Sequence, residues 1–186
     1  MQSTASGGSL VDRMIGALRL DARTFEGIEH DTGATGQAAI VVILAAIAGG
    51  IGTVGEEGGQ GFFAGIISSL IGWAVFAGFA YFVGTRLLAG PATQSSWSEV
   101  LRTLGFAYTP MILTVLGFIP ILGAIISLIA FIWFLAAGVI ALRQALDMDT
   151  GRAVMVGVVA WLLQIVVAII ISLFLGAALF GVSSLF

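Results

Sequence analysis

The sequence contains no cysteine and no lysine, and only 9% of its 186 residues are charged. Without cysteine the chain has no disulfide framework, no thiolate metal site and no thiol nucleophile. A soluble domain usually has about one quarter of its residues charged, so this composition argues against a soluble fold. The net charge of −3 is too small to indicate a nucleic-acid partner.

Hydrophobic residues dominate the composition. They make up 59% of the chain, and the mean hydropathy is +1.13. The chain also has 26 glycines, which suit helices that pack closely within a membrane. The composition therefore predicts an integral membrane protein.

The longest uncharged stretch lies between Arg102 and Arg143, with 40 residues in between. As one helix it would reach roughly 60 Å, about twice the ~30 Å hydrocarbon core of a bilayer. Pro120 lacks an N–H donor, and Gly117 and Gly123 beside it tolerate a tight turn. We therefore expect a transmembrane hairpin with both arginines on the same side of the membrane.

The complete pattern predicts an all-α, polytopic helical bundle with five transmembrane helices. Ser98 is expected to cap the third span, with Glu99 in its first turn, and Asp149 or Thr150 to cap the fifth. Residues 37–186 form one transmembrane domain, with spans at about 37–54, 62–85, 99–118, 121–142 and 153–180.

The part of the chain before the first span is polar or amphipathic. Residues 1–8 are expected to be disordered, and residues 9–36 to form a cytoplasmic amphipathic segment. Ser9 and Asp12 have the spacing of a helix N-cap, and Asp21 is expected to cap a second short helix. The first helix can lie in the membrane interface or pack against the protein's own loops, and the sequence leaves both readings open.

The arginines predict the orientation. In a five-span topology all seven lie on one side, and the other side carries none (complete list: Arg13, Arg19, Arg23, Arg86, Arg102, Arg143 and Arg152). The positive-inside rule then places the N-terminus in the cytoplasm and the C-terminus outside.

The predicted spans offer no catalytic machinery. No acidic residue, arginine or histidine falls near the centre of a span, which argues against ion-coupled transport. His30, the only histidine, lies beside Glu26, Glu29 and Asp31, but a single imidazole there is expected to be solvated. We expect no catalytic residues, no cofactor-binding residues and no metal site. Gln164 is expected to form a hydrogen bond between helices.

The connection before the fifth span is the most charged short loop. Its charged residues are a possible partner-docking patch (complete list: Arg143, Asp147, Asp149 and Arg152). The alternative is that these residues form local salt bridges and a helix cap at the membrane surface.

Several segments resemble the Yip1 family. They are Gly105-Phe106-Ala107-Tyr108-Thr109-Pro110, which is like the family's glycine–tyrosine–proline motif, Arg23-Thr24-Phe25-Glu26, and the Gly117–Gly123 turn with Pro120. Trp133 and Ala141-Leu142-Arg143-Gln144-Ala145 complete the similarity, which runs from about residue 20 to 175. The resemblance implies a five-helix membrane domain with a cytoplasmic N-terminus. The chain has no Asp-Leu-Tyr-Gly-Pro segment, so we do not expect the Rab GTPase binding of eukaryotic members.

These observations favour a non-enzymatic scaffold or adaptor in the cytoplasmic membrane of a prokaryote. Its partners would be membrane lipids and either another protein or further copies of itself, through the cytoplasmic face. The alternative is a small transporter or channel for a neutral or lipidic molecule, with the broken hairpin as its moving element.

Overall fold

The computed structural model describes residues 8–52 and 59–183, and it describes the side chains of 8–52 and 62–174. The described chain is helical and contains no strand, which confirms the predicted all-α class. Its elements in order are α1 (Leu10–Leu18), α2 (Ala22–His30), α3 (Ala34–Gly52), α4 (Gly59–Phe82), the π-helical segment η1 (Val83–Leu87), α5 (Trp97–Ala107), the 3₁₀ helix η2 (Thr109–Phe118), α6 (Leu122–Ala145) and α7 (Thr150–Ser183). The expectations for residues 1–7, 53–58 and 184–186 lie outside the described residues.

Five stretches are long and apolar enough to cross a membrane, as predicted. They are Ala34–Gly52, Phe62–Leu87, Trp97–Phe118, Leu122–Ala145 and Thr150–Phe174. Several boundaries differ from the expected ones by two or three residues. The first span begins at Ala34, before Gln37, and α6 continues past Arg143 to Ala145.

The helix caps explain where several elements begin. Ser9 accepts a hydrogen bond from the backbone N–H of Asp12, and Asp21 accepts one from Arg23, as predicted. The prediction that Ser98 caps the third span is wrong. Ser96 is the cap, because its side chain and that of Glu99 form a reciprocal capping box.

The third span is not one continuous α-helix. The α-helical part, α5, ends at Ala107, and Pro110 lies at the start of η2, which continues in 3₁₀ conformation to Phe118. Proline cannot donate the α-helical hydrogen bond to the preceding turn, so the chain tightens into the 3₁₀ form. Most 3₁₀ helices are only three or four residues long, and η2 has ten.

The hairpin turn between η2 and α6 is centred on Ile121. Its backbone has φ 65° and ψ −54°, and the N–H of Leu122 donates to the carbonyl of Pro120 at 2.7 Å. This is the classic γ-turn, which is a strained conformation for a β-branched residue. The predicted hairpin is thus confirmed, with the turn at Pro120–Leu122.

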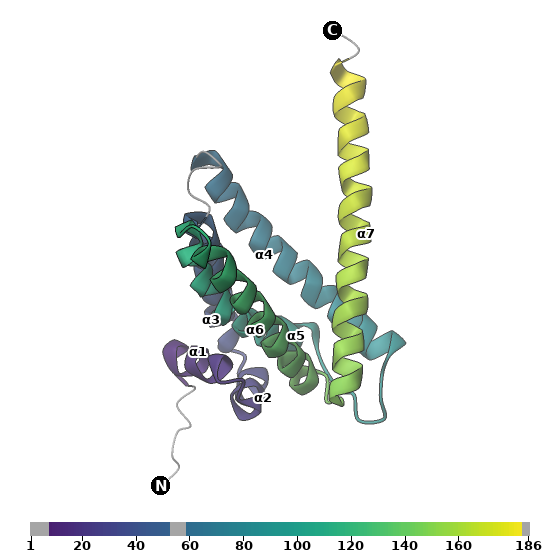
Figure 1. Cartoon of the computed structure of the whole chain (residues 1–186). Helices are drawn as coiled ribbons and strands as arrows, with labels where there is room; N and C mark the ends of the chain where they lie inside the picture. Colours follow the sequence, from purple (N-terminus) through teal and green to yellow (C-terminus); the bar gives the residue numbers. More distant parts are fainter. Residues whose placement is uncertain (1–7, 53–58, 184–186) are drawn as a thin grey trace.

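The spans do not contribute equally to the core. In the apolar 18-residue window of the third span 56% of the residues are buried, but in the window of Thr150–Phe174 the share is 11%. The core of the bundle is formed by α3, α5, η2 and α6. Figure 1 shows α4 and α7 meeting near one end of the bundle and diverging toward the other. The described parts of both helices carry exposed large apolar side chains, such as Ile67 of α4 and Ile169 of α7, which are open to lipid or to another protein.

The two short helices lie across one end of the bundle, under α5 and α6 (Figure 1). Phe25 and Ile28 of α2 and Ala17 of α1 are completely buried. The structure thus favours the reading in which the amphipathic segment packs on the protein. Val11 and Ile15 of α1 still point outward.

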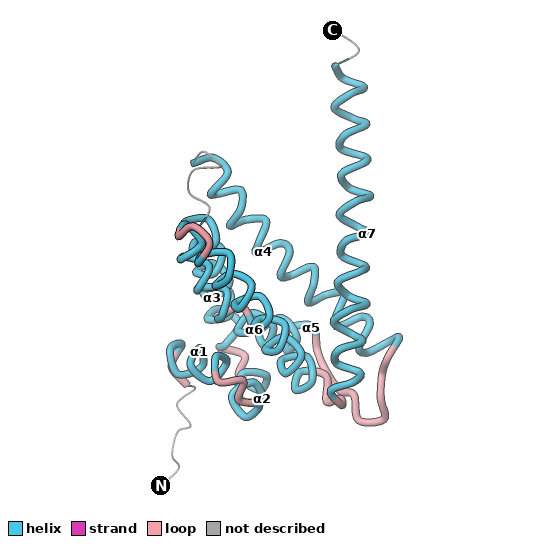
Figure 2. The backbone as a smooth tube through the Cα atoms, in the orientation of Figure 1, coloured by secondary structure: helices cyan, strands magenta, loops and turns pink. Residues whose placement is uncertain are grey.

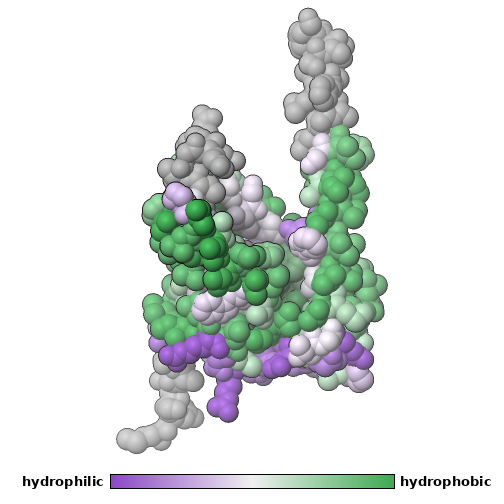
Figure 3. Space-filling view, viewed as in Figure 1, coloured by the Kyte–Doolittle hydropathy of each residue, from purple (hydrophilic) through white to green (hydrophobic). Residues whose placement is uncertain are grey.

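All seven arginines lie at this same end of the bundle: on α1, at its C-cap (Arg19), on α2 or at the ends of spans. The loop of residues 88–96 is at this end too (Figure 2). Figure 3 shows the hydrophilic residues gathered there, below a broad hydrophobic surface. We call this end the arginine-rich face.

Candidate functional site

Arg102 anchors the arginine-rich face. The sequence places it at the end of the predicted hairpin, and the structure shows its side chain almost completely buried. Its Nε donates to the backbone carbonyls of Ile28 at 3.1 Å and Glu29 at 2.7 Å, and its Nη2 also donates to Glu29. Those carbonyls end α2, where a helix favours positive charge. The guanidinium therefore holds the C-terminus of α2 against α5.

Arg13 of α1 is a second buried arginine that holds the amphipathic segment in place. Its side chain is buried, pairs with Asp31 and donates to the side chain of Gln37 at 3.1 Å. Trp133 of α6 donates from its indole nitrogen to the carbonyl of Leu18 at 2.9 Å. These contacts join the amphipathic segment to the start of α3 and to α6.

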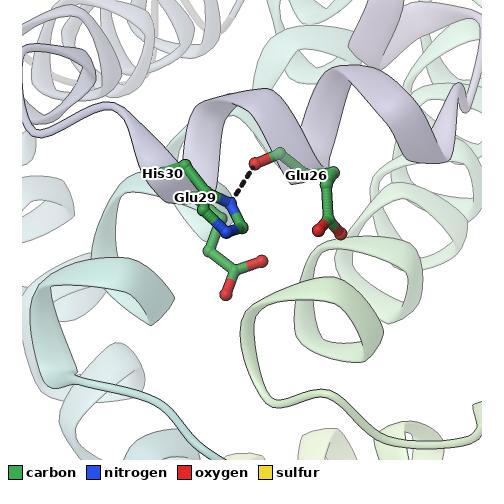
Figure 4. A group of neighbouring side chains, drawn as sticks. All are labelled: Glu26, Glu29 and His30. Atoms are coloured by element: carbon green, nitrogen blue, oxygen red, sulfur yellow. Dashed lines mark hydrogen bonds between the residues drawn. The ribbon is translucent and has the colours of Figure 1, made fainter.

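Three acidic and basic side chains gather on one side of α2. The ligand-type atoms of Glu26, Glu29 and His30 all lie within 4.8 Å of one another (Figure 4). Glu26 accepts a hydrogen bond from the Gln144 side chain at 2.8 Å. Glu29 is only 6% exposed, and its Oε2 has no hydrogen-bond partner among the described residues. Burial, followed by the carboxylates of Asp147 and Glu26, raises the pKa of the Glu29 carboxyl to about 7.

The four residues of the possible docking patch are partly engaged with local partners. The Asp149 carboxylate lies 3.5 Å from Nε of Arg152. It also accepts a hydrogen bond from the backbone N–H of Arg152 at 3.0 Å, so Asp149 caps α7. Arg143 donates to Gln144 at 3.1 Å. Asp147 is exposed at the turn after α6, with φ 46°. Docking of a partner here remains a prediction.

The motif residues of the third span are packing residues. Gly105 lies so close to α3 that an added Cβ would be 2.6 Å from the Cβ of Ala38, and Phe106 is completely buried. The Tyr108 ring packs against Phe134, with the centroids 4.8 Å apart and the ring planes tilted by 56°. Pro110 begins the 3₁₀ helix. The structure thus places these residues between α3, α5 and α6.

The turn glycines bring backbones together at the other end of the bundle. A Cβ on Gly117 would lie 3.1 Å from the carbonyl oxygen of Gly52, at the end of α3. A Cβ on Gly123 would collide with the backbone of Gly117, and Pro120 lies at the exposed tip. Only glycine allows this close approach of α3, η2 and α6.

A cavity of about 910 Å³ lies between α3, α4, η2 and α6. Its lining is mostly apolar and glycine-rich, with hydroxyl groups from Ser69, Tyr108, Thr114 and Ser127. Gly65 and Ser69 of α4, whose spacing suggests helix contact, instead face this cavity. An added Cβ on Gly65 would have nothing within 4 Å. Gln164 makes the expected bond between helices, to the Gly72 carbonyl at 3.2 Å.

These features define the class as a polytopic helical membrane protein with five candidate spans and with the charged side chains of its described residues at one end. A family model described as the Yip1 domain matches residues 15–172. The chain therefore belongs to the Yip1 domain family, as the sequence resemblance predicted. Searches of curated proteins and of solved structures gave no match.

Sequence reasoning missed two parts of the site. It did not recognise that Arg102 binds α2, because the contact spans 73 and 74 residues of sequence. It noted Glu26, Glu29 and His30 but placed His30 in a loop, whereas His30 is the last residue of α2. The i, i+3, i+4 spacing of the three side chains was the available signal.

Proposed function

We propose that this Yip1-family protein is a non-enzymatic membrane scaffold or adaptor. The observation that supports the proposal is the separation of polar and apolar surface. Within the candidate spans every described charged side chain lies in the first six or the last three residues, at the arginine-rich face. Arg19, Arg23 and Arg86 are exposed there, and Val11 and Ile15 of α1 point outward. Such a surface suits anionic lipid headgroups and an acidic protein partner.

The polar contacts of the described residues also support a role without catalysis. His30 forms its hydrogen bond with the backbone carbonyl of Glu26 at 2.9 Å, which is not a nucleophile. Thr109 and Thr114 bond back to carbonyls of their own chain turn, those of Phe106 and Met111. These contacts give no base that would activate a hydroxyl.

We place the protein in the cytoplasmic membrane of a prokaryote, with the arginine-rich face in the cytoplasm and the C-terminus outside. The arginine distribution supports this orientation. The partner would be another protein or a second copy of the chain, and the cytoplasmic segment of residues 9–36 would contribute to its binding surface.

The scaffold proposal is tested by isolating the tagged protein from its own membranes in lipid nanodiscs and identifying bound proteins by mass spectrometry. The docking variant carries Arg143→Gln, Asp147→Asn, Asp149→Asn and Arg152→Gln. Asparagine at 147 tolerates the positive φ, and asparagine at 149 still caps α7. The matched variant, Arg19→Gln with Arg23→Gln, removes two exposed charges from α1 and α2.

A stoichiometric partner that is lost from either variant and retained by the other supports the proposal and locates the binding surface. A partner retained by both variants, or isolation of the protein alone, contradicts it. Either variant must keep the wild-type melting temperature for the comparison to hold.

The cavity supports a second candidate function, the binding or passage of a neutral or lipidic molecule. Its volume of about 910 Å³ falls within the range of small-molecule sites, and its lining is mostly apolar. Gly65→Leu would fill it without a clash, and Gly138→Leu is a matched control because Gly138 has equal space but does not line the cavity. Flux or lipid scrambling in reconstituted vesicles that Gly65→Leu alone reduces would favour this function. Vesicles no more active than empty ones would exclude it.

A further inference from the structure

The feature with the clearest unexplained chemistry is the side of α2 that carries Glu26, Glu29 and His30. These residues have i, i+3 and i+4 spacing, so successive turns bring them to one face of the helix. Figure 4 shows both carboxylates and the imidazole on the same side of α2. One ligand atom from each lies within 4.8 Å of the others, so small rotations of the exposed Glu26 and His30 side chains would let a single ion contact all three.

Glu29 is the independent sign that this group binds something. The side chain is 6% exposed, and its Oε2 is buried without a hydrogen bond among the residues that the structure describes. The neighbouring guanidinium of Arg102 is directed to backbone carbonyls and lies 3.6 Å from Glu99. A buried carboxylate oxygen without a partner is costly, and such an atom usually marks a bound ion or water.

The other two residues are held in orientations suited to a cation. Nδ1 of His30 contacts the Glu26 carbonyl at 2.9 Å, and a carbonyl can only accept. In the neutral imidazole the proton therefore resides on Nδ1, and Nε2 keeps its lone pair for a ligand bond. Gln144 of α6 donates to the Glu26 carboxylate at 2.8 Å and fixes its direction.

We propose that Glu26, Glu29 and His30 bind one divalent transition-metal cation of the Zn²⁺ or Mn²⁺ type. Two carboxylates with one imidazole are a ligand set for these metals, whereas Mg²⁺ and Ca²⁺ prefer oxygen ligands alone. Asp147 and Glu99 lie near enough to interact electrostatically with Glu29, and they add negative charge around the cation. In this proposal His30 is a metal ligand, whereas the sequence alone predicts a solvated side chain.

The position of the site gives the metal a structural consequence. Its ligands lie on α2, Gln144 lies on α6, and Asp147 lies in the turn between α6 and α7. A bound cation would therefore reinforce the docking of the amphipathic segment on the bundle, beside the backbone contacts of Arg102.

The test uses the full-length chain in nanodiscs, purified without a histidine tag and freed of metal with a chelator. Zn²⁺ is titrated by calorimetry. A second readout is available because His30 is the only histidine, so ¹³C-labelled histidine gives a single imidazole NMR signal. The proposal predicts one equivalent of Zn²⁺ and a shift of that signal. With Mn²⁺ the same signal should broaden.

The variants assign the ligands. Glu29→Gln and His30→Gln should each weaken Zn²⁺ binding at least tenfold, and Gln144→Ala should weaken it by about 10- to 100-fold through loss of Glu26 orientation. Asp12→Asn removes an exposed acid on α1 and should leave the affinity unchanged. Glu29→Gln keeps the shape of the side chain, and its melting temperature verifies folding. Failure to bind Zn²⁺, or an affinity equal in Glu29→Gln and wild type, overturns the proposal.

Discussion

The guanidinium of Arg102 closes the last turn of α2, with its Nε 2.7 Å from the carbonyl oxygen of Glu29. A residue of a candidate membrane span thus holds a short helix that is not part of the five spans. This contact connects the bundle to the amphipathic segment, and Arg102 is directed to backbone carbonyls and to Glu99.

Replacing Arg102 should release α2. Arg102→Met leaves the Glu29 carbonyl without its side-chain donor, and a buried unpaired group costs about 1–3 kcal/mol, whereas the Ile28 carbonyl still accepts from the N–H of Asp31 at 3.3 Å. Hydrogen exchange followed by mass spectrometry should show faster exchange in α1 and α2, together with a lower melting temperature. The exposed Arg86 provides the control, since Arg86→Met should change neither. Unchanged exchange in Arg102→Met would show that the contact does not hold α2.

Ile121 stores backbone strain in the hairpin turn. Ile121→Gly should raise the free energy of unfolding by about 1 kcal/mol, because glycine adopts φ 65° without a steric penalty. Leu122→Gly is the neighbouring control and should destabilise, since Leu122 is the first residue of α6. Unfolding in a denaturing detergent measures both. If Ile121→Gly is the less stable variant of the two, the γ-turn assignment is incorrect.

Adding even a methyl group at Gly105 should destabilise the protein. Gly105→Ala places a Cβ 2.6 Å from the Cβ of Ala38 and 3.0 Å from the ring of Trp73, and overpacking of this kind costs about 1–3 kcal/mol. Ala38→Gly removes the nearer atom, so the double variant should recover part of the loss. A double-mutant cycle of melting temperatures checks the coupling. Simple additivity would argue against direct contact between these positions.

The absence of cysteine allows the proposed orientation to be measured directly. Single cysteines at Thr32→Cys, in the turn before α3, and Ser183→Cys, at the end of α7, provide one thiol each. In spheroplasts a membrane-impermeant maleimide should label Ser183→Cys, and it should label Thr32→Cys only after lysis. The reverse pattern would place the arginine-rich face outside.

Most of the fold was predictable because the bilayer simplifies the problem. The uncharged run between Arg102 and Arg143 is too long for one span and has Pro120 near its middle, so the sequence predicts a hairpin. The five spans follow from hydropathy, and the caps at Ser9 and Asp21 follow from side-chain chemistry. The third cap was missed although Ser96 and Glu99 have capping-box spacing, because Ser98 is a competing candidate.

The site was less predictable because it depends on tertiary contacts. Nothing in the sequence near Arg102 shows that its partners are carbonyls of α2. The spacing of Glu26, Glu29 and His30 can be read from the sequence, but the burial of Glu29 beneath α5 and α6 cannot. The sequence also did not indicate that the third span changes from α-helix to 3₁₀ helix. The ten-residue 3₁₀ segment after Tyr108 is supported by contacts with α3 and α6, and such tertiary contacts cannot be read from the sequence.

That 3₁₀ segment equalises the two arms of the hairpin. The third span has 22 residues and α6 has 24, so as plain α-helices they would differ in length by about 3 Å. A 3₁₀ helix rises about 2.0 Å per residue, which stretches the shorter arm to roughly 38 Å against roughly 36 Å for α6. The change to 3₁₀ conformation at Pro110 thereby compensates for the shorter arm and makes the two arms of the hairpin nearly equal in length.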